Sequence, residues 1–180
     1  MRASFLLILI CSLVCLSCSE KGQLKNEGLT YLDFQQKLGM GMDYNALKST
    51  FGNPLKDAGS GIHIYVYKLV DLSEIWIGYV DHILYARHMD RNQQLLENVR
   101  FLNSTAMITG PDVRMCACCG GWFILISGIS YEFDTLPAGS SLDLQQAKFP
   151  LTVEIDWQLS DLTGCPNNKI LLQRIAAASN

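Results

Sequence analysis

The sequence predicts an α+β fold, with a two-helix, three-strand antiparallel module followed by a small five-stranded, mostly β domain that resembles an OB-like barrel. Three observations support this prediction. Apolar residues recur at helical spacing between residues 30 and 52, alternate in short runs between residues 62 and 89, and return in β-rich segments after residue 104. We therefore assign residues 30–98 to the first module and residues 99–180 to the second domain.

Two short helices are expected at the start of the first module. The stretch Thr30-Tyr31-Leu32-Asp33 has the spacing of a helix-capping signal, and Leu32 and Phe34 are expected on the apolar face of the helix that it begins. Asp43 is the expected N-cap of the second helix. The stretch Gly52-Asn53-Pro54 ends this helix, because proline cannot continue a helix and disfavours helical geometry at the residue before it.

Three strand-like runs follow, beginning at Ile62, Glu74 and His82. The links between them, residues 70–73 and Asp81, are short enough for hairpins. We expect the three strands to form an antiparallel sheet with both helices packed on one of its faces.

Two finer expectations concern the end of this module. Strict alternation predicts that the odd-numbered apolar residues of the third strand share one face. The connection that follows, residues 90–104, is expected to contain a short helix. These expectations rest on Ile83, Tyr85 and Met89 for the strand and on Leu95, Leu96 and Val99 for the helix.

The stretch GMDYNALKSTFGNP, residues 41–54, resembles the helix-containing segment of the SmpA/OmlA family of envelope lipoproteins and of related inhibitor-like modules. The strand-like stretches GSGIHIYVYKL and WIGYVDHILYARHMD resemble the strands of the same module, so the resemblance covers about residues 31–98. The chain departs from the family at Asp71-Leu72-Ser73, where such hairpins often carry Asp-Gly. The resemblance implies a non-enzymatic module that binds another protein of the cell envelope.

The second domain is expected to be almost entirely β. Five strands with an insertion at residues 138–147, after the third strand, match the count and order of an OB-type barrel. The alternative is a small sandwich fused to the first sheet. The expected strands are residues 105–109, 122–126, 130–133, 151–157 and 169–175.

Residues 1–17 have the pattern of an export signal. Arg2 supplies a basic start, and the apolar run of residues 5–15 is too short to span a bilayer as a helix. Ser17-Cys18 resembles the end of a bacterial lipobox. The resemblance implies that Cys18 becomes the first mature residue and carries lipid, including a palmitate-like acyl chain, on its sulfur and amino group.

This lipid would tie the protein to a membrane through residues 18–29, a polar tether. Because Ser19 rather than Asp follows the cysteine, the same resemblance implies the cell outer membrane. The alternative is an ordinary secretory signal that is cut near Ser19. In either case the mature chain lies outside the cytosol, where disulfide bonds persist.

Four cysteines remain in the mature chain beyond Cys18, and their state is left open among three possibilities. The favoured one is a structural disulfide between the loop at residues 116–119 and Cys165, which would contribute about 4 kcal/mol by closing a long loop. A zinc or copper site with four thiolate ligands is the first alternative, and a reactive thiol pair is the second. The four residues are Cys116, Cys118, Cys119 and Cys165.

Composition and motifs narrow the function. The net charge is −3 and no block of basic residues is present, which argues against nucleic acid as a partner. The sequence contains no phosphate-binding glycine motif, no HExxH motif and no nucleophile elbow, so no catalytic residues are assigned. The three histidines are expected to be solvent-facing or hydrogen-bonded, and a hydrolytic enzyme ranks third, after the interaction module and the metal or thiol-redox protein.

Overall fold

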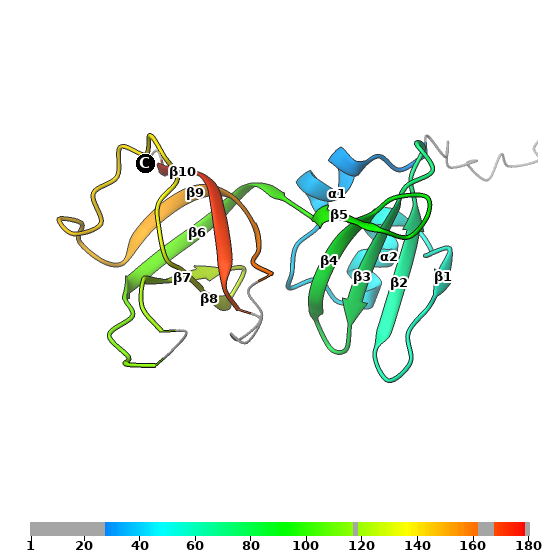
Figure 1. Cartoon of the computed structure of the whole chain (residues 1–180), viewed down its shortest axis with the longest axis horizontal. Helices are drawn as coiled ribbons and strands as arrows, with labels where there is room; N and C mark the ends of the chain where they lie inside the picture. The colour runs from blue at the N-terminus through cyan, green and yellow to red at the C-terminus, as the bar shows by residue number, and fades with distance from the viewer. Residues whose placement is uncertain (1–27, 117–118, 162–167, 179–180) are drawn as a thin grey trace, which may run out of the picture.

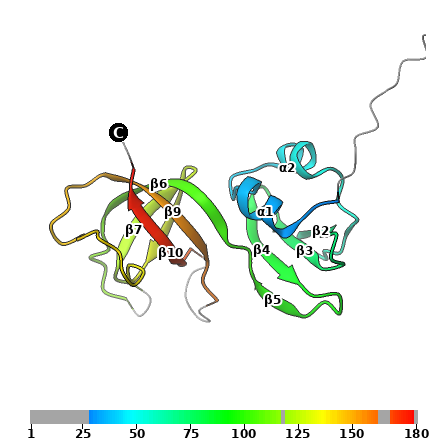
Figure 2. The same cartoon turned by 90° about the horizontal axis from the view of Figure 1, so that it is seen from above.

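The structure, a computed structural model, describes residues 28–116, 119–161 and 168–178. In these residues ten strands form two antiparallel sheets of five strands each, accompanied by two short helices. The two sheets lie side by side rather than face to face, which does not match a fused sandwich (Figures 1 and 2). The chain is thus α+β and mostly β, as the sequence predicts. No helix in the described residues is long and apolar enough to cross a bilayer.

The first sheet has the strand order β1-β2-β3-β4-β5, and both helices lie on one side of it (Figure 2). Its three central strands are those expected from the sequence. The prediction of three strands was nevertheless incomplete, because β1 and β5 add short strands at the two edges. The bounds are α1 Tyr31–Lys37, α2 Tyr44–Phe51, β1 Lys56–Asp57, β2 His63–Lys68, β3 Glu74–Tyr79, β4 Ile83–Met89 and β5 Leu95–Asn98.

The helix N-termini follow the sequence signals closely. The Thr30 hydroxyl oxygen accepts a hydrogen bond from the Asp33 amide at 3.2 Å, and the Asp33 carboxylate accepts one from the Thr30 amide at 2.9 Å. This reciprocal capping box begins α1, which buries Phe34 completely. Leu32, however, is 50% exposed, so its expected place on the buried face is wrong.

Two expectations for the end of the first sheet were also wrong. A register shift between β3 and β4 turns Ala86 and His88 toward the core, so strict alternation from Ile83 does not hold. The expected helix around residue 96 is instead strand β5, which pairs with β4. Pairing with an available sheet edge determines the conformation of this segment, and local helical spacing does not.

The second sheet contains all five strands expected from the sequence, in the order β10-β9-β6-β7-β8. The OB-like barrel expected from the sequence, a partly open architecture, is not confirmed, because among the described residues β8 and β10 are not joined by a ladder and only one isolated parallel bridge links Glu132 of β8 to Lys169. The sheet is therefore open. The bounds are β6 Phe101–Pro111, β7 Trp122–Ile126, β8 Ile129–Phe133, β9 Leu151–Leu159 and β10 Ile170–Ala177.

The two halves of the chain share one continuous hydrophobic core. Val99 and Phe101, at the junction between the sheets, are both buried in it. The Asn98 amide nitrogen Nδ2 donates to the Leu159 carbonyl at 3.1 Å, which links the end of β5 to β9. The first sheet is thus joined to the second domain, which contains the cysteines that the sequence analysis considered as a site.

Candidate functional site at the open edge of the second sheet

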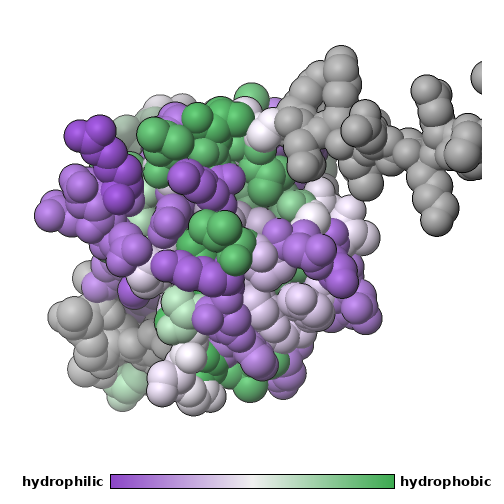
Figure 3. Space-filling view, turned by 90° about the vertical axis from the view of Figure 1, so that its right-hand side faces the viewer, coloured by the Kyte–Doolittle hydropathy of each residue, from purple (hydrophilic) through white to green (hydrophobic). Residues whose placement is uncertain are grey.

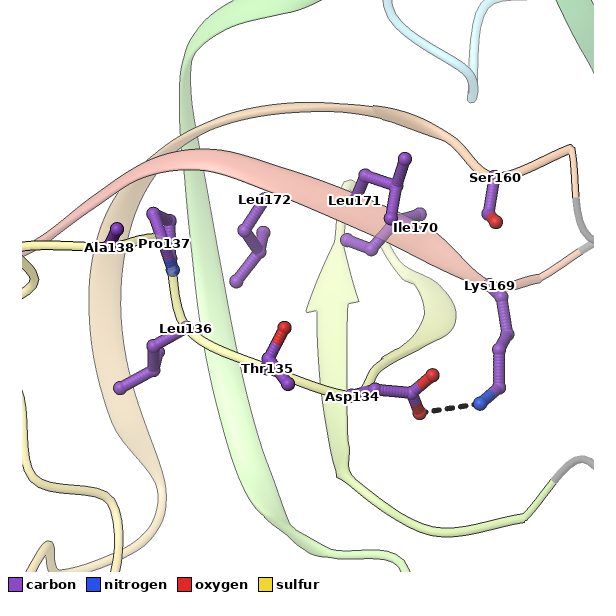
Figure 4. A pocket seen from close by; sticks show the side chains of 10 residues that line it. All are labelled: Asp134, Thr135, Leu136, Pro137, Ala138, Ser160, Lys169, Ile170, Leu171 and Leu172. Atoms are coloured by element: carbon purple, nitrogen blue, oxygen red, sulfur yellow. Dashed lines mark hydrogen bonds and ion pairs between the residues drawn. The ribbon is translucent and has the colours of Figure 1, made fainter.

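A groove of about 520 Å³ lies between β10 and residues 134–138, which follow β8 (Figure 4). Apolar side chains line much of it, including Leu136, Leu171 and Leu172. Leu171 is 47% exposed, although it belongs to a strand. The groove therefore combines accessible apolar surface with a defined shape, as binding sites for other molecules commonly do.

One wall of the groove is the unpaired edge of β10. Among the residues that the structure describes, β10 has a ladder partner only in β9 along most of its length. The Ser160 amide donates to the Lys169 carbonyl at 2.9 Å, which directs the backbone groups of Lys169 toward β9. Because this direction alternates along an antiparallel strand, we expect the N–H and C=O groups of Leu172 to point away from β9. Such groups can pair with an added strand.

An ion pair closes one end of the groove. The Lys169 ammonium Nζ lies 2.5 Å from Asp134 Oδ1, and both residues line the groove (Figure 4). Farther along β10, a register shift lies between Leu172 and Arg174. The Arg174 guanidinium donates two hydrogen bonds to the Asp156 carboxylate of β9, each of 3.0 Å. The pairable part of the edge is thus the first half of β10.

The cysteine loop, residues 112–121, lies between β6 and β7 and contains a disulfide between Cys116 and Cys119. Its base is held by Asp112, whose side chain has no solvent exposure. The Asp112 carboxylate accepts hydrogen bonds from Arg114 Nε at 2.8 Å and from the Gly120 amide at 3.0 Å. The Arg114 guanidinium, helped by the Gly120 amide, holds the pKa of the Asp112 carboxyl well below its usual range.

Glu132 of β8 joins this loop to the start of β10. Its carboxylate Oε1 accepts from Arg114 Nη2 at 2.5 Å and from Asn168 Nδ2 at 3.2 Å, and its side chain is 3% exposed. The Glu132 amide also donates to the Asn168 carbonyl at 2.9 Å. The cysteine loop and the ion-paired end of the groove are therefore parts of one hydrogen-bonded structure.

The two glycines after the cysteines adopt backbone conformations that favour glycine. Gly120 and Gly121 have φ of 116° and 76°. A Cβ atom on Gly121 would lie 2.2 Å from the Phe133 carbonyl oxygen. Glycine is thus required at position 121, both for its backbone conformation and for the close approach of β8.

The cysteines predicted as a site are only partly described. The structure joins Cys116 to Cys119, whereas Cys118, Cys165 and the proposed lipid acceptor Cys18 lie outside the described residues. No group of three or more potential metal ligands occurs among the described residues.

A serine–histidine contact occurs in the first sheet. His88 Nε2 lies 2.9 Å from the Ser73 hydroxyl, and Asp71 Oδ1 accepts a hydrogen bond from the same hydroxyl at 2.5 Å. Both Ser73 and His88 are buried, and the Tyr31 ring stacks on the imidazole at 4.2 Å. In a catalytic triad the carboxylate contacts the imidazole, whereas here it contacts the serine. This contact therefore stabilises the β2–β3 turn.

The sequence did not reveal the groove, because its walls are more than thirty residues apart in the chain. The one local signal is the doublet Leu171-Leu172, which breaks the alternation expected of a half-buried strand. Comparison with models of protein families, with curated proteins and with solved structures gave no match to this chain. The chemistry of the site is therefore inferred from its own residues.

Proposed function

We propose that this chain is a non-enzymatic, lipid-anchored protein of the bacterial cell envelope that binds a partner protein through the second sheet. The sequence pattern around Cys18 supports the anchor and the outer membrane as its location. The observation that carries the binding proposal is the apolar groove beside the unpaired edge of β10. An extended segment of another envelope protein is the ligand that such an edge fits best.

In this proposal the partner segment adds a strand to β10. Main-chain hydrogen bonds to the outward-facing groups near Leu172 provide affinity, each contributing about 0.5–1.5 kcal/mol net. Apolar side chains of the segment enter the groove against Leu136 and provide specificity. The ion pair between Lys169 and Asp134 limits how far the added strand extends along β10.

We also propose that the second domain belongs to the OB-type architecture. Its strand order and the parallel contact between Glu132 and Lys169 support this assignment. The groove then occupies the part of the barrel that stays open, between the third and fifth strands of the domain.

The binding proposal is tested by co-purification from membranes after reversible crosslinking. Leu171→Lys places a charge on the edge strand, and we expect it to lower the recovery of the partner at least about tenfold. Gln173→Lys is the matched control, because Gln173 is also exposed on β10 but does not line the groove. Recovery of the same partner with Leu171→Lys, or its loss with both variants, would contradict the proposal.

A second candidate function, thiol-redox or metal chemistry at the cysteine loop, is favoured by one observation. The disulfide has CxxC spacing and lies beside Met115, which is fully exposed. No helix begins in the described part of this loop, however, so the described residues offer no helix dipole to lower a thiol pKa.

Alkylation separates this candidate from a structural disulfide. The intact mass of the mature chain is measured after alkylation with and without reduction, together with its zinc and copper content. Four alkylated thiols before reduction and one stoichiometric ion would support the metal site. No alkylated thiol before reduction, and no metal, would leave disulfides as the state of all four cysteines.

A further inference from the structure

Five large apolar side chains are exposed at one end of the first sheet, and together we call them the apolar end. They are half of the ten such exposed residues in the described chain, with exposures between 46% and 59%. On the side of the molecule that Figure 3 shows, hydrophobic side chains gather along the upper edge. The five residues are Leu32 of α1, Val70 and Leu72 of the β2–β3 turn, and Leu95 and Leu96 of β5.

Strand register places the four residues of the β2–β3 turn and of β5 at the same end of the sheet. Lys68, the last residue of β2, pairs with Glu74, the first residue of β3. Glu74 in turn pairs with Met89 of β4, and Met89 pairs with Leu95 of β5. The β2–β3 turn and the start of β5 therefore project from one edge of the module.

The turn holds Leu72 in a conformation that leucine rarely adopts. The Leu72 amide donates to the Leu69 carbonyl at 3.1 Å, and the Leu69 amide donates to the Ser73 carbonyl at 2.9 Å. This is a three-residue hairpin loop, in which the last loop residue is left-handed and is normally glycine. Leu72 has φ of 71° and is largely exposed. Its side chain is thus unfavourable for the folded protein alone, which indicates a role outside the fold.

The described chain begins beside this turn. The Val70 amide donates to the Leu29 carbonyl at 3.0 Å, and a Cβ atom on Gly28 would lie 2.5 Å from Val70 Cγ1. Gly28 lies only ten positions after Cys18 in the sequence. A tether of that length spans at most about 36 Å when fully extended. If Cys18 carries lipid, the membrane surface therefore lies within this distance of the apolar end.

We propose that the apolar end inserts shallowly into the surface of the membrane to which Cys18 is anchored, an inference that rests on the proposed lipid anchor. Lipid is the occupant that the position of the tether favours. The nearby charges are mixed in sign, with Asp71 and Asp90 beside Lys68 and Arg91, so attraction to anionic lipid does not drive the contact. Burial of the five apolar side chains at the headgroup boundary of an uncharged bilayer does.

The test uses the full acylated chain reconstituted in phosphatidylcholine vesicles that contain acyl-brominated lipid. Leu72→Trp places a fluorophore at the apolar end, and Ser60→Trp places one in the exposed β1–β2 loop at the opposite end of the sheet. We expect brominated lipid to quench the emission added by Leu72→Trp at least about twofold more than that added by Ser60→Trp. Equal quenching of the two, or none, would overturn the inference.

Two further measurements keep the outcomes distinct. The acyl mass at the N-terminus is determined on the same sample, so that an acylated chain without quenching contradicts the membrane contact and leaves the anchor intact. An unacylated chain instead contradicts the proposed anchor. If Leu72→Trp lowers the melting temperature, Val70→Trp replaces it. A third outcome is that the added tryptophan emission changes with protein concentration and not with brominated lipid. This outcome would show that the apolar end contacts a second copy of the chain, and it would contradict the inference.

Discussion

The two five-stranded sheets end in very different edges. The edge strands of the first sheet, β1 and β5, have two and four residues, so they offer few unpaired backbone groups. The edge strand β10 of the second sheet has eight residues and lies beside an apolar groove. Natural sheets usually protect such a long edge from pairing with other chains. The comparison indicates that backbone pairing is available at the long edge of the second sheet, whereas the short edges of the first sheet offer little of it.

Particular turns of the two sheets differ in the residue that occupies the left-handed position. In the first sheet, the left-handed positions of two hairpins are occupied by Leu72 and Gln93. In the second sheet, the cysteine loop uses Gly120 and Gly121. The β7–β8 turn also has a left-handed residue other than glycine, Ser127, so the contrast holds for these particular turns. Leu72 displays an apolar side chain at a strained position, whereas Gly121 lets the cysteine loop approach the backbone of Phe133 closely.

The largest expected effect tests the close approach in the second sheet. We expect Gly121→Ala to lower the free energy of unfolding by about 3–4 kcal/mol, because the new Cβ meets both a positive φ and the Phe133 carbonyl oxygen. Gly139→Ala is the matched control, with φ of 81° but no atom within 4 Å of the new Cβ, and about 1–2 kcal/mol is expected. Urea unfolding gives both values. Equal losses would show that β8 does not approach position 121.

The next effect concerns the buried carboxylates beneath the cysteine loop. Arg114→Met leaves Asp112 and Glu132 without their shared cation, and we expect it to lower the free energy of unfolding at pH 7, because both carboxylates are buried. Because Arg114 lowers the pKa of Asp112, its stabilisation is present above pH 4 and is lost as the pH falls further. The difference between the wild type and Arg114→Met should therefore shrink toward pH 3.

A control in the first sheet sharpens this result. Arg87 is exposed and lies over the Tyr85 ring, with 4.6 Å between its Cζ atom and the ring centroid. We expect Arg87→Met to change the free energy of unfolding by less than about 1 kcal/mol, because an exposed cation–π contact is weak. If Arg87→Met lowered the free energy of unfolding as much as Arg114→Met does, this result would contradict the contrast between the two halves.

A smaller effect of opposite sign is expected at the strained turns of the first sheet. Leu72→Asn and Gln93→Asn should each raise the free energy of unfolding by about 0.5–1 kcal/mol, because asparagine adopts left-handed geometry more readily. Only Leu72→Asn should also weaken contact with phosphatidylcholine vesicles, because it alone removes apolar surface. Thermal unfolding and vesicle binding of the two variants test this pair. A destabilised Leu72→Asn would show that the leucine serves the fold.

The smallest effect lies at the start of α1. Hydrogen bonds from Lys37 and Thr30 lower the pKa of Asp33 to about 2. A carboxyl with a lowered pKa stabilises the fold above its ordinary value near pH 4, and this contribution disappears as the pH falls through about 2. Asp33→Ala should therefore cost about 0.5 kcal/mol at pH 6 and almost nothing at pH 2, as measured by urea unfolding. A difference that does not depend on pH would show that the capping box does not form.

Sequence reasoning succeeded where a signal is local. The N-caps at Thr30 and Asp43 depend on hydrogen bonds across three residues, so they could be predicted directly. It failed where a neighbouring strand determines the outcome. The segment around Leu96 forms a strand because β4 offers it an edge, and the register shift in β4 reverses the expected facing of Tyr85.

The candidate site shows the same division. The glycine pair after the cysteines could be interpreted from the sequence, because it supplies a backbone conformation that other residues disfavour. The role of Glu132 could not be predicted, since its partners Arg114 and Asn168 are 18 and 36 residues away along the chain. Nothing in the alternation along β8 distinguishes this buried acid from an acid on a solvated face.

The sequence by itself determined the α+β class, the central strands of both sheets and the helix N-termini, because these depend on periodicity and on contacts between near neighbours. Tertiary structure alone decided that the second sheet stays open and that its edge lies beside a groove. It also brought the turn at Leu72, the first turn of α1 and the start of β5 together into one apolar end. These features depend on which distant segments pair, and strand pairing is determined by the packing of the whole chain.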